Sequence, residues 1–554
     1  MEPKNGWFQL ESRRPVNGSK PEGNETSSVR PPVPEFIQSG QDTAKSNNVD
    51  NNTNRQKSSA AITPSSGIQP QGKSSENLLN TEMNLNPPTP TTENKPNMPE
   101  NQYKAQSPST SWANDRTLET RHSQTVGIRG PVLEQDSILH EALEIFIHTK
   151  IPERPVHVKG FGAFGYFETS YSMSEFTKLS FLQFPGQQVP VMVRFSLAAG
   201  NKGTPDTARN VRGFSTKFYT QEGIFDLLCN HIPVLFVRDG IRFPEAFSSL
   251  APSPVNNLID PERFWRFVAR APEATHFVTW LFSDVGTVKS LRHIRGYGVN
   301  TYVWRNAEGV RRYVKYHWIP QAGEEYIDQR ESVALAGMNP DIAGQNLYDT
   351  IASGTPVQYE LRVQLMDPKD EGSLPYDPLD CTKVWDEQKY PLMPVGRLVL
   401  NRNPDNYMEQ VEKAAFSPTN LLDGAELSDD KLLQARANIY WDSQRRRLGE
   451  NFRSIPVNQQ KDWTPDEQVT SGTGRQVEGH LVRSELTNPD NFTQAGQRYH
   501  SLPPEEQNHL VDNLASDLAN ISEETQSVVL KYLYTASAEL GQRVAAHISF
   551  YTGK

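Results

Sequence analysis

The segment Ile151–Glu168, IPERPVHVKGFGAFGYFE, carries one histidine between a charged turn and a run of glycines and aromatic residues. In this setting His157 can act as a proton-transfer group over a cofactor. It can also be an ordinary core histidine that is packed and hydrogen-bonded. The segment by itself leaves both interpretations open.

A second segment, Arg436–Gly449 (RANIYWDSQRRRLG), places a tyrosine between arginines at helical spacing. Tyr440 follows Arg436 by four residues and precedes Arg447 by seven, so all three lie on one face of a helix. Tyrosine binds a metal as the phenolate, and an adjacent guanidinium favours that anion because opposite charges stabilise each other. The alternative is an amphipathic helix with a packed tyrosine.

The first segment also contains a formal G-x-G-x-x-G at Gly160, Gly162 and Gly165. A dinucleotide-binding fingerprint needs an apolar strand before it and a helix after it. The preceding IPERPVHVK contains two prolines and several charged residues. We therefore reject a dinucleotide site here.

Hydrophobic periodicity predicts the elements that must position these residues. Helices are predicted over Asp136–His148 and Ser428–Arg447, after Pro503 and Pro504, and over Glu523–Leu533. Strands are predicted at Val191–Phe195, Arg212–Tyr219, His231–Arg238, Tyr302–Trp304, Arg312–Trp318 and Val357–Leu365, with a hairpin turn at Asn306–Gly309. Repeated strands with inserted helices suggest an antiparallel barrel.

Composition limits the partners and the compartment. The net charge of −10, without a long basic run, argues against nucleic acid as a partner. Two cysteines, Cys229 and Cys381, exclude a disulfide framework and suit a reducing cytoplasm. We expect no secretory signal, since MEPKNGWFQLESRR has no apolar region, and no membrane span.

Both chemical segments resemble those of the haem catalase family: the distal active-site segment and the haem-ligand helix. The similarity extends over about residues 128–455. It implies the α+β catalase fold, an antiparallel eight-stranded β-barrel with a wrapping segment and C-terminal helices, without the flavodoxin-like domain of large-subunit catalases. It also implies a haem enzyme that converts hydrogen peroxide to water and dioxygen, protects against oxidative stress and forms a homotetramer.

We divide the chain accordingly. Residues 1–125 are polar and proline-rich, which predicts a disordered tail. Residues 126–365 are expected to form the barrel, residues 366–455 the wrapping segment and haem-ligand helix, and residues 456–554 a C-terminal helical region.

The resemblance also implies residue roles. His157 transfers the peroxide proton, Asn230 donates a hydrogen bond to peroxide, and Ser196 orients His157. Tyr440, paired with Arg436, is the iron ligand, as tyrosine is in catalases. The other implied haem contacts are Arg154, Arg194 and Arg447 at the propionates, with Val156, Phe243 and Phe416 around the haem. Haem type b or d is left open.

Several positions depart from the family pattern and put the turnover rate in question. They are Asn210 for a channel aspartate, Asn300 for a histidine in the network of Arg436 and Asp430, His231 beside Asn230, and Asn438 and Ile439 in the ligand helix. Val285, Ile319 and Glu387 stand where NADPH-binding catalases carry Arg, Lys and His, so NADPH is not expected. The alternatives are another haem reaction on this fold, or a non-catalytic haem-binding protein.

Overall fold

The computed structural model describes residues 122–459, 478–484 and 489–552. Almost all of the predicted N-terminal tail, residues 1–125, lies outside the described residues. The elements that position the two chemical segments all lie within them.

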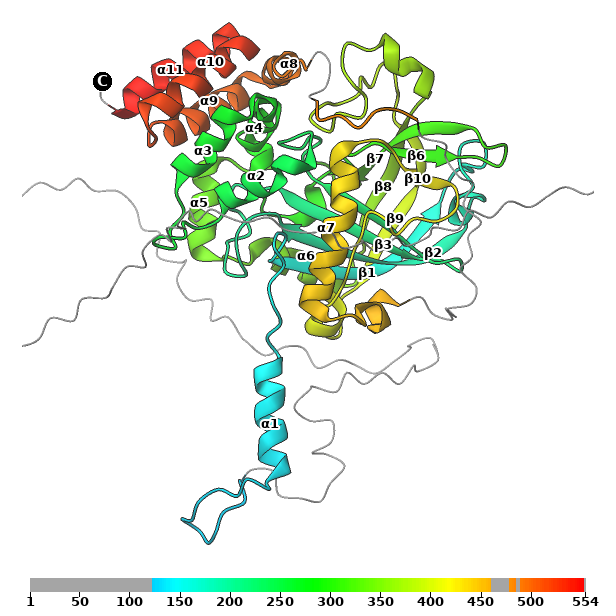
Figure 1. Cartoon of the computed structure of the whole chain (residues 1–554), viewed down its shortest axis with the longest axis vertical. Helices are drawn as coiled ribbons and strands as arrows, with labels where there is room; N and C mark the ends of the chain where they lie inside the picture. The colour runs from blue at the N-terminus through cyan, green and yellow to red at the C-terminus, as the bar shows by residue number, and fades with distance from the viewer. Residues whose placement is uncertain (1–121, 460–477, 485–488, 553–554) are drawn as a thin grey trace, which may run out of the picture. The chain divides into compact units, whose positions relative to one another are not determined.

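Ten strands form one antiparallel sheet, and eight of them close into a barrel (Figure 1). The order around the barrel is β7, β5, β4, β3, β2, β1, β9 and β8, and β8 pairs with β7 to close it. The strands are β1 Gly160–Thr169, β2 Gln188–Leu197, β3 Arg212–Tyr219, β4 Ile224–Asn230, β5 Gly296–Tyr297, β6 Tyr302–Arg305, β7 Arg311–Pro320, β8 Val357–Met366, β9 Met393–Arg402 and β10 Ala425–Leu427. The predicted eight-stranded antiparallel barrel is confirmed.

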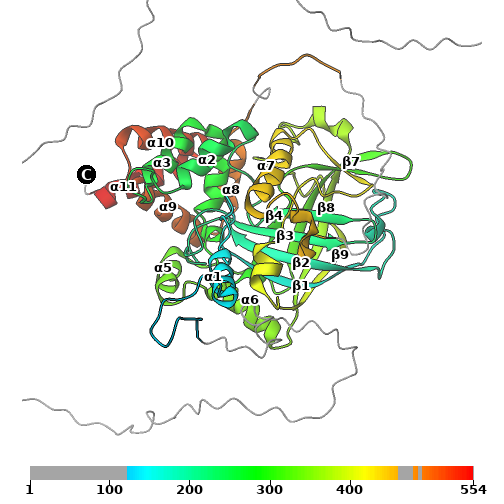
Figure 2. The same cartoon turned by 60° about the horizontal axis from the view of Figure 1, so that its bottom comes forward.

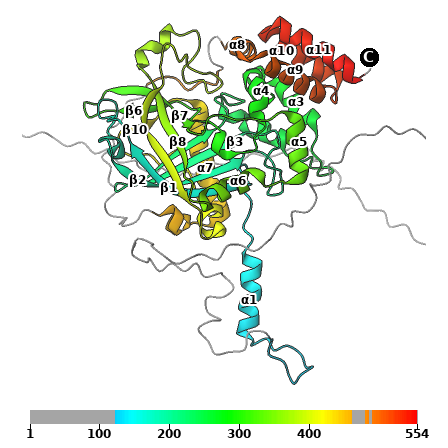
Figure 3. The ribbon, with the colours of Figure 1, turned by 180° about the vertical axis from the view of Figure 1, so that it is seen from behind.

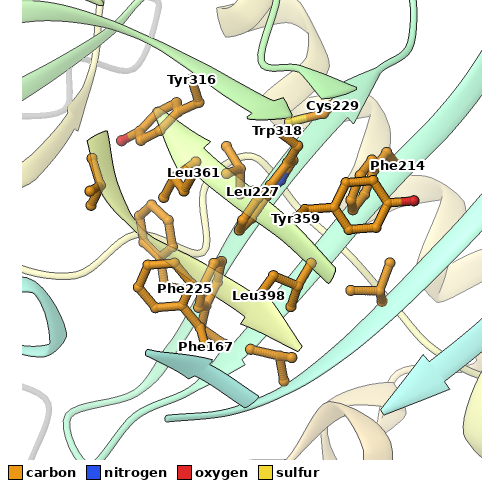
Figure 4. Close-up of a cluster of buried hydrophobic side chains, with 14 of the residues drawn as sticks. Phe167, Phe214, Phe225, Leu227, Cys229, Tyr316, Trp318, Tyr359, Leu361 and Leu398 are labelled. Atoms are coloured by element: carbon orange, nitrogen blue, oxygen red, sulfur yellow. The ribbon is translucent and has the colours of Figure 1, made fainter. Parts of the chain in front are cut away.

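Large side chains from several strands fill the barrel interior (Figure 4). Trp318 of β7 stacks on Phe214 of β3 with ring centroids 5.7 Å apart. Phe167 of β1 meets the same indole edge-on at 6.1 Å. The barrel interior is therefore a packed core. Because side chains alternate between the two faces of a strand, the residues between the core positions face outward. A binding site can therefore form on the outer face of the wall.

One strand prediction is wrong. The described residues His231–Arg238 are buried but form no strand, and β4 ends just before them at Asn230. Pro233 has no N–H for sheet pairing, and the Leu235 N–H donates to the Cys381 carbonyl instead (2.9 Å). A short, continuous apolar run does not by itself distinguish a strand from other buried chain.

Four barrel strands, β1, β4, β5 and β9, lie where no strand was predicted. Glycine has a low strand propensity, but Gly165 of β1 is required by close packing, since a Cβ there would lie 1.8 Å from the Val399 oxygen of β9. Gly160, Gly162 and Gly165 all lie within this strand, consistent with the rejection of a dinucleotide site. Because β9 pairs with β1 and β8, the barrel extends beyond residue 365, where we expected the wrapping segment to begin.

Helix α7 (Lys431–Leu448), which carries the tyrosine segment, lies along the barrel wall (Figures 1 and 2). Its first turn is capped by Asp430, whose carboxylate accepts from the N–H groups of Leu432 and Leu433. It ends at Gly449, which adopts φ +83°. The predicted helix over Ser428–Arg447 is thus present with slightly shifted ends.

Helices α8 to α11 gather beside α3 and α4 (Figure 3). The helices are α1 Ser137–His148, α2 Phe243–Leu250, α3 Pro261–Arg270, α4 Thr275–Leu281, α5 Gln329–Met338, α6 Ile342–Ala352, α7 Lys431–Leu448, α8 Thr493–Ser501, α9 Pro504–Leu518, α10 Glu523–Ala536 and α11 Ala538–Thr552. Within the described ranges, no helix is long and apolar enough to cross a membrane.

Candidate active site

A cavity of about 490 Å³ lies between the outer face of the barrel wall and helices α2 and α7. On β2, Val193 and Phe195 belong to the barrel core, whereas Arg194 and Ser196 face the cavity. Of the predicted site residues, the cavity is lined by Arg154, Val156, His157, Arg194, Ser196, Phe243, Phe416 and Tyr440. The structure thus brings both chemical segments to one cavity.

His157 is held from three directions. Its Nδ1 lies 3.0 Å from Ser196 Oγ, and its backbone N–H donates to the Ala198 carbonyl at 3.0 Å. The Arg194 guanidinium donates to the carbonyls of His157 (2.9 Å) and Val158 (3.0 Å). These contacts hold His157 at φ +62°, a backbone conformation that few residues other than glycine adopt. With Nδ1 engaged, Nε2 is the nitrogen available for proton transfer.

Burial lowers the pKa of His157 to about 3, and the positive charges of Arg194, Arg436 and Arg154 act in the same direction. The imidazole is therefore neutral at physiological pH. A general base must be able to accept a proton, and a neutral imidazole can do so without first losing one.

Behind Tyr440, four residues form a continuous hydrogen-bonded chain. Asn300 Nδ2 donates to Asp430 Oδ2 at 2.6 Å, and Asn300 Oδ1 accepts from Arg436 Nη1. Arg436 Nη2 then lies 3.1 Å from Tyr440 Oη. Burial alone lowers the pKa of Arg436, but its interactions with Tyr440, Tyr302 and Asp430 together more than offset this and raise the pKa. Asn300 thus bridges Arg436 and Asp430 within the predicted network.

A cluster of cations lies at one edge of the cavity around Glu412, whose side chain is 1% exposed. Glu412 pairs with Arg154 (3.3 Å), Arg447 (3.0 Å) and the more exposed Lys202 (3.7 Å). Burial lowers the pKa of Arg154, that of Arg194 to about 9 and that of Arg447 to about 10. One carboxylate faces four cations, so the cluster has room for further negative charge.

Two buried nitrogens of this cluster, Arg154 Nη1 and Arg194 Nε, have no hydrogen-bond partner within the described residues, although Arg154 Nη1 forms the ion pair with Glu412 at 3.3 Å. Both belong to residues that line the cavity. Buried donors are rarely left unpaired, so this edge of the cavity suits an anionic ligand. Arg447 reaches the cluster through Glu412 but does not line the cavity.

Sequence reasoning missed Glu412. It ends a π-helical turn, Met408–Glu412, whose irregular backbone presents the Val411 and Glu412 carbonyls to Arg154. π-Helical turns are frequent at functional sites. The surrounding NYMEQVEKAAF carries no pattern that distinguishes this glutamate from a surface residue.

Most of the other predicted residues do not themselves line the cavity, although Asn230 pairs with Gly213, next to Ser196 in the sheet. Asn230 ends β4, and Asn210 uses both polar atoms of its amide to bind the backbone of Ala199. His231 is fully buried, where it accepts from the Arg212 N–H and donates to the Val285 carbonyl. In the ligand helix, Asn438 is exposed and only Ile439 lines the cavity.

The fold and the cavity define a class of protein: an enzyme in which a buried, neutral histidine and an arginine-paired tyrosine face one cavity on the outside of an eight-stranded barrel. Two family profiles match the chain, Catalase over residues 110–489 and Catalase-related immune-responsive over residues 485–548. Catalase-1/2 of Glycine max is 38% identical over 468 residues, which cover 79% of this chain and 94% of the relative. Catalase-1 of Arabidopsis thaliana is 39% identical over the same shares.

Solved structures agree. Catalase A from Saccharomyces cerevisiae superposes with a TM-score of 0.74 at 32% identity, covering 77% of this chain and 96% of that chain. A bacterial catalase superposes with a TM-score of 0.73 at 35% identity, covering 78% and 93%. The chain therefore belongs to the catalase family, and it is an enzyme that disproportionates hydrogen peroxide to water and dioxygen. In the described residues that follow α7, the elements longer than a single short turn are helices α8 to α11, and these residues contain no flavodoxin-like sheet.

Three other buried histidines predict acid sensitivity. Burial lowers the pKa of His231, His276 and His317 from 6.5 to about 3. Below pH 6.5 these histidines become protonated in the unfolded chain but stay neutral in the native state. The free energy of unfolding is therefore greatest above pH 6.5 and falls as the pH drops toward 3. The expected loss is about 2 kcal/mol per histidine at about pH 5.

The measurement is urea unfolding between about pH 8 and pH 4. The matched variant is His231→Gln, because glutamine can also accept one hydrogen bond and donate another without titrating. We expect the free energy of unfolding of this variant to fall less steeply as the pH decreases. The difference in slope should correspond to about one proton. An unchanged slope in His231→Gln would show that His231 does not contribute.

Proposed function

We propose that the cavity binds haem with Tyr440 as the iron ligand and His157 on the opposite face. The observation that carries this proposal is the joint placement of His157 and the Arg436–Tyr440 pair on one cavity. The described residues contain no cluster of three or more His, Cys, Asp or Glu side chains suited to a metal. An iron held by Tyr440 would therefore take its other ligands from a macrocycle, as haem iron does.

The cation cluster fits the two carboxylates of haem. Arg154, Arg194 and Arg447 would bind the propionates, and Arg194 Nε, which has no hydrogen-bond partner among the described residues, is a donor available for this purpose. Planar guanidinium groups suit carboxylates. Val156, Phe243 and Phe416 supply the apolar lining against the rest of the ring.

The haem iron supplies the oxidation and reduction of peroxide; the residues of the chain move the proton and orient the substrate. His157 Nε2 takes a proton from one peroxide oxygen and returns it to the other, which leaves as water. Ser196, at Nδ1, fixes the ring so that Nε2 faces the substrate. Asn230, which lies across Gly213 from Ser196 in the sheet, would donate a hydrogen bond to the peroxide. The overall balance is two hydrogen peroxide molecules to two waters and one dioxygen.

Oxygen evolution by the purified, haem-loaded protein tests this function. We expect one dioxygen for every two peroxide molecules consumed. Oxidation of an aromatic donor without dioxygen release would indicate a peroxidase instead. Haem binding without either reaction would indicate a non-catalytic haem protein.

We propose a homotetramer in the cytoplasm, with no nucleic acid or membrane as a partner. The tetramer is supported by α1, which has no buried residue in the single chain. Its apolar side chains Leu143, Phe146 and Ile147 are 50%, 75% and 63% exposed, which suits contact with another subunit. Both cysteines are free and buried, which suits a reducing compartment. Light scattering at micromolar concentration should give four times the 62.5 kDa chain mass. A monomer at that concentration would contradict the tetramer.

We expect no tight binding of NADPH. Its phosphates need cationic partners, but Val285 is buried and apolar, Ile319 is neutral, and Glu387 is exposed and acidic. Calorimetric titration at low salt should show no saturable heat in the micromolar range. A one-to-one isotherm would show that another basic residue, such as Arg292 or His293, supplies the charge.

A further inference from the structure

We propose that Gly213 is a positioning residue for His157, because its missing side chain leaves the space that the imidazole ring occupies. The inference rests on the proposed function, since it gives Gly213 its role through the proposed proton-transfer histidine. Gly213 lies on β3, in the segment RNVRGFSTKFYT. It carries no side chain of its own that could react.

The strand register places Gly213 at the centre of the proposed proton-transfer site. It pairs with Ser196 of β2 on one side and with Asn230 of β4 on the other. The two polar residues of the site thus flank Gly213 in one row across the sheet, and the His157 ring lies over it. A Cβ added at this position would meet the Ser196 hydroxyl and the His157 ring.

The available space is smaller than a methyl group. A Cβ on Gly213 would lie 2.6 Å from Ser196 Oγ, 2.7 Å from His157 Nδ1 and 2.8 Å from His157 Cε1. All three distances are shorter than van der Waals contact. The affected atoms belong to side chains, and Gly213 is in ordinary strand conformation, so alanine leaves the backbone of β3 intact. The added methyl group therefore acts on the hydrogen bond between Nδ1 and Oγ.

His157 cannot make room by shifting its backbone. The Ala198 carbonyl holds its N–H, and the Arg194 guanidinium holds its carbonyl. Rotation of the imidazole relieves the contacts with the ring, and rotation of the Ser196 side chain relieves the contact with Oγ; either rotation breaks the bond that sets the direction of Nε2. The expected effect is on proton transfer more than on folding.

A second glycine of the same row serves the same assembly. Gly160 of β1 pairs with Ser196 on the side opposite Gly213. A Cβ on Gly160 would lie 2.5 Å from Arg194 Cζ, and Arg194 is the residue that holds the His157 carbonyl. Glycines on both sides of Ser196 thus make room for the ring and for the guanidinium that fixes it.

The test is Gly213→Ala in the haem-loaded protein. We expect kcat for peroxide to fall by about 10²- to 10⁴-fold, the contribution typical of a general acid–base group, with haem content unchanged. In a His157→Ala background the ring is absent, so Gly213→Ala should alter the residual rate by less than about twofold. An equal loss in both backgrounds would overturn the proposal, and so would full activity in Gly213→Ala.

A matched control is Gly296→Ala on β5. A Cβ there would lie 2.7 Å from Phe214 Cδ1, in the barrel core rather than the cavity. We expect a lower Tm and an unchanged kcat. If Gly213→Ala alone does not fold, Gly213→Ala with His157→Ala should fold, because the ring contact is removed; failure of the pair as well would count against the proposal.

The rate of cyanide binding distinguishes a failure of this inference from a failure of the proposed function. Hydrogen cyanide must give up its proton to bind ferric haem as the anion, so a base in the cavity accelerates binding. Gly213→Ala should slow cyanide association even if the unaltered protein evolved no dioxygen. Unchanged cyanide association together with a reduced kcat would contradict a role through His157.

Discussion

The variant His157→Ala is expected to lose about 10²- to 10⁴-fold in kcat for peroxide while keeping its haem. In the proposed mechanism the imidazole moves the proton between the two peroxide oxygens, whereas the proposed haem contacts come from the arginines and Tyr440. Oxygen evolution and the absorption spectrum, measured on one preparation, separate the two effects.

The matched control is His500→Ala, a histidine on α8 that is exposed to solvent. Its kcat should equal that of the unaltered protein. If His157→Ala retained most of the oxygen evolution, His157 would have no part in proton transfer.

Tyr440→Phe is expected to abolish activity through the cofactor. Phenylalanine keeps the ring but removes the oxygen that would bind iron, and it leaves the partly buried Arg436 without the Tyr440 hydroxyl as a partner. Haem should be lost during purification, or remain with a spectrum that lacks the phenolate ligand.

Tyr348→Phe is the control for this change, since Tyr348 lies on α6 and is 54% exposed. It should bind haem normally. An unaltered spectrum and full activity in Tyr440→Phe would rule out Tyr440 as the ligand.

The sequence predicted the strands whose alternation is regular. In β8, alternate residues from Val357 to Val363 are buried as expected. The pattern then changes: Gln364 is 2% exposed and donates to the Tyr390 carbonyl, whereas Leu365 is only partly buried. Alternation cannot reveal a buried amide, because the partner that satisfies it lies far away in the chain.

The same limitation explains what was missed around the site. The helical spacing of Arg436 and Tyr440 predicted their contact, because both residues lie on one element. Glu412 and Gly213 act through residues on other elements, and their importance depends on distances set by the closed barrel. A glycine in a strand and a glutamate in a polar segment have no sequence pattern that marks them.

An anomalous difference map at the iron absorption edge, from crystals of the haem-loaded protein, shows where the metal lies. We expect a single iron peak inside the cavity, within bonding distance of Tyr440 Oη and on the side of the haem away from His157. An iron bound to His157, or a cavity without iron in a protein that evolves dioxygen, would contradict the assignment of both residues.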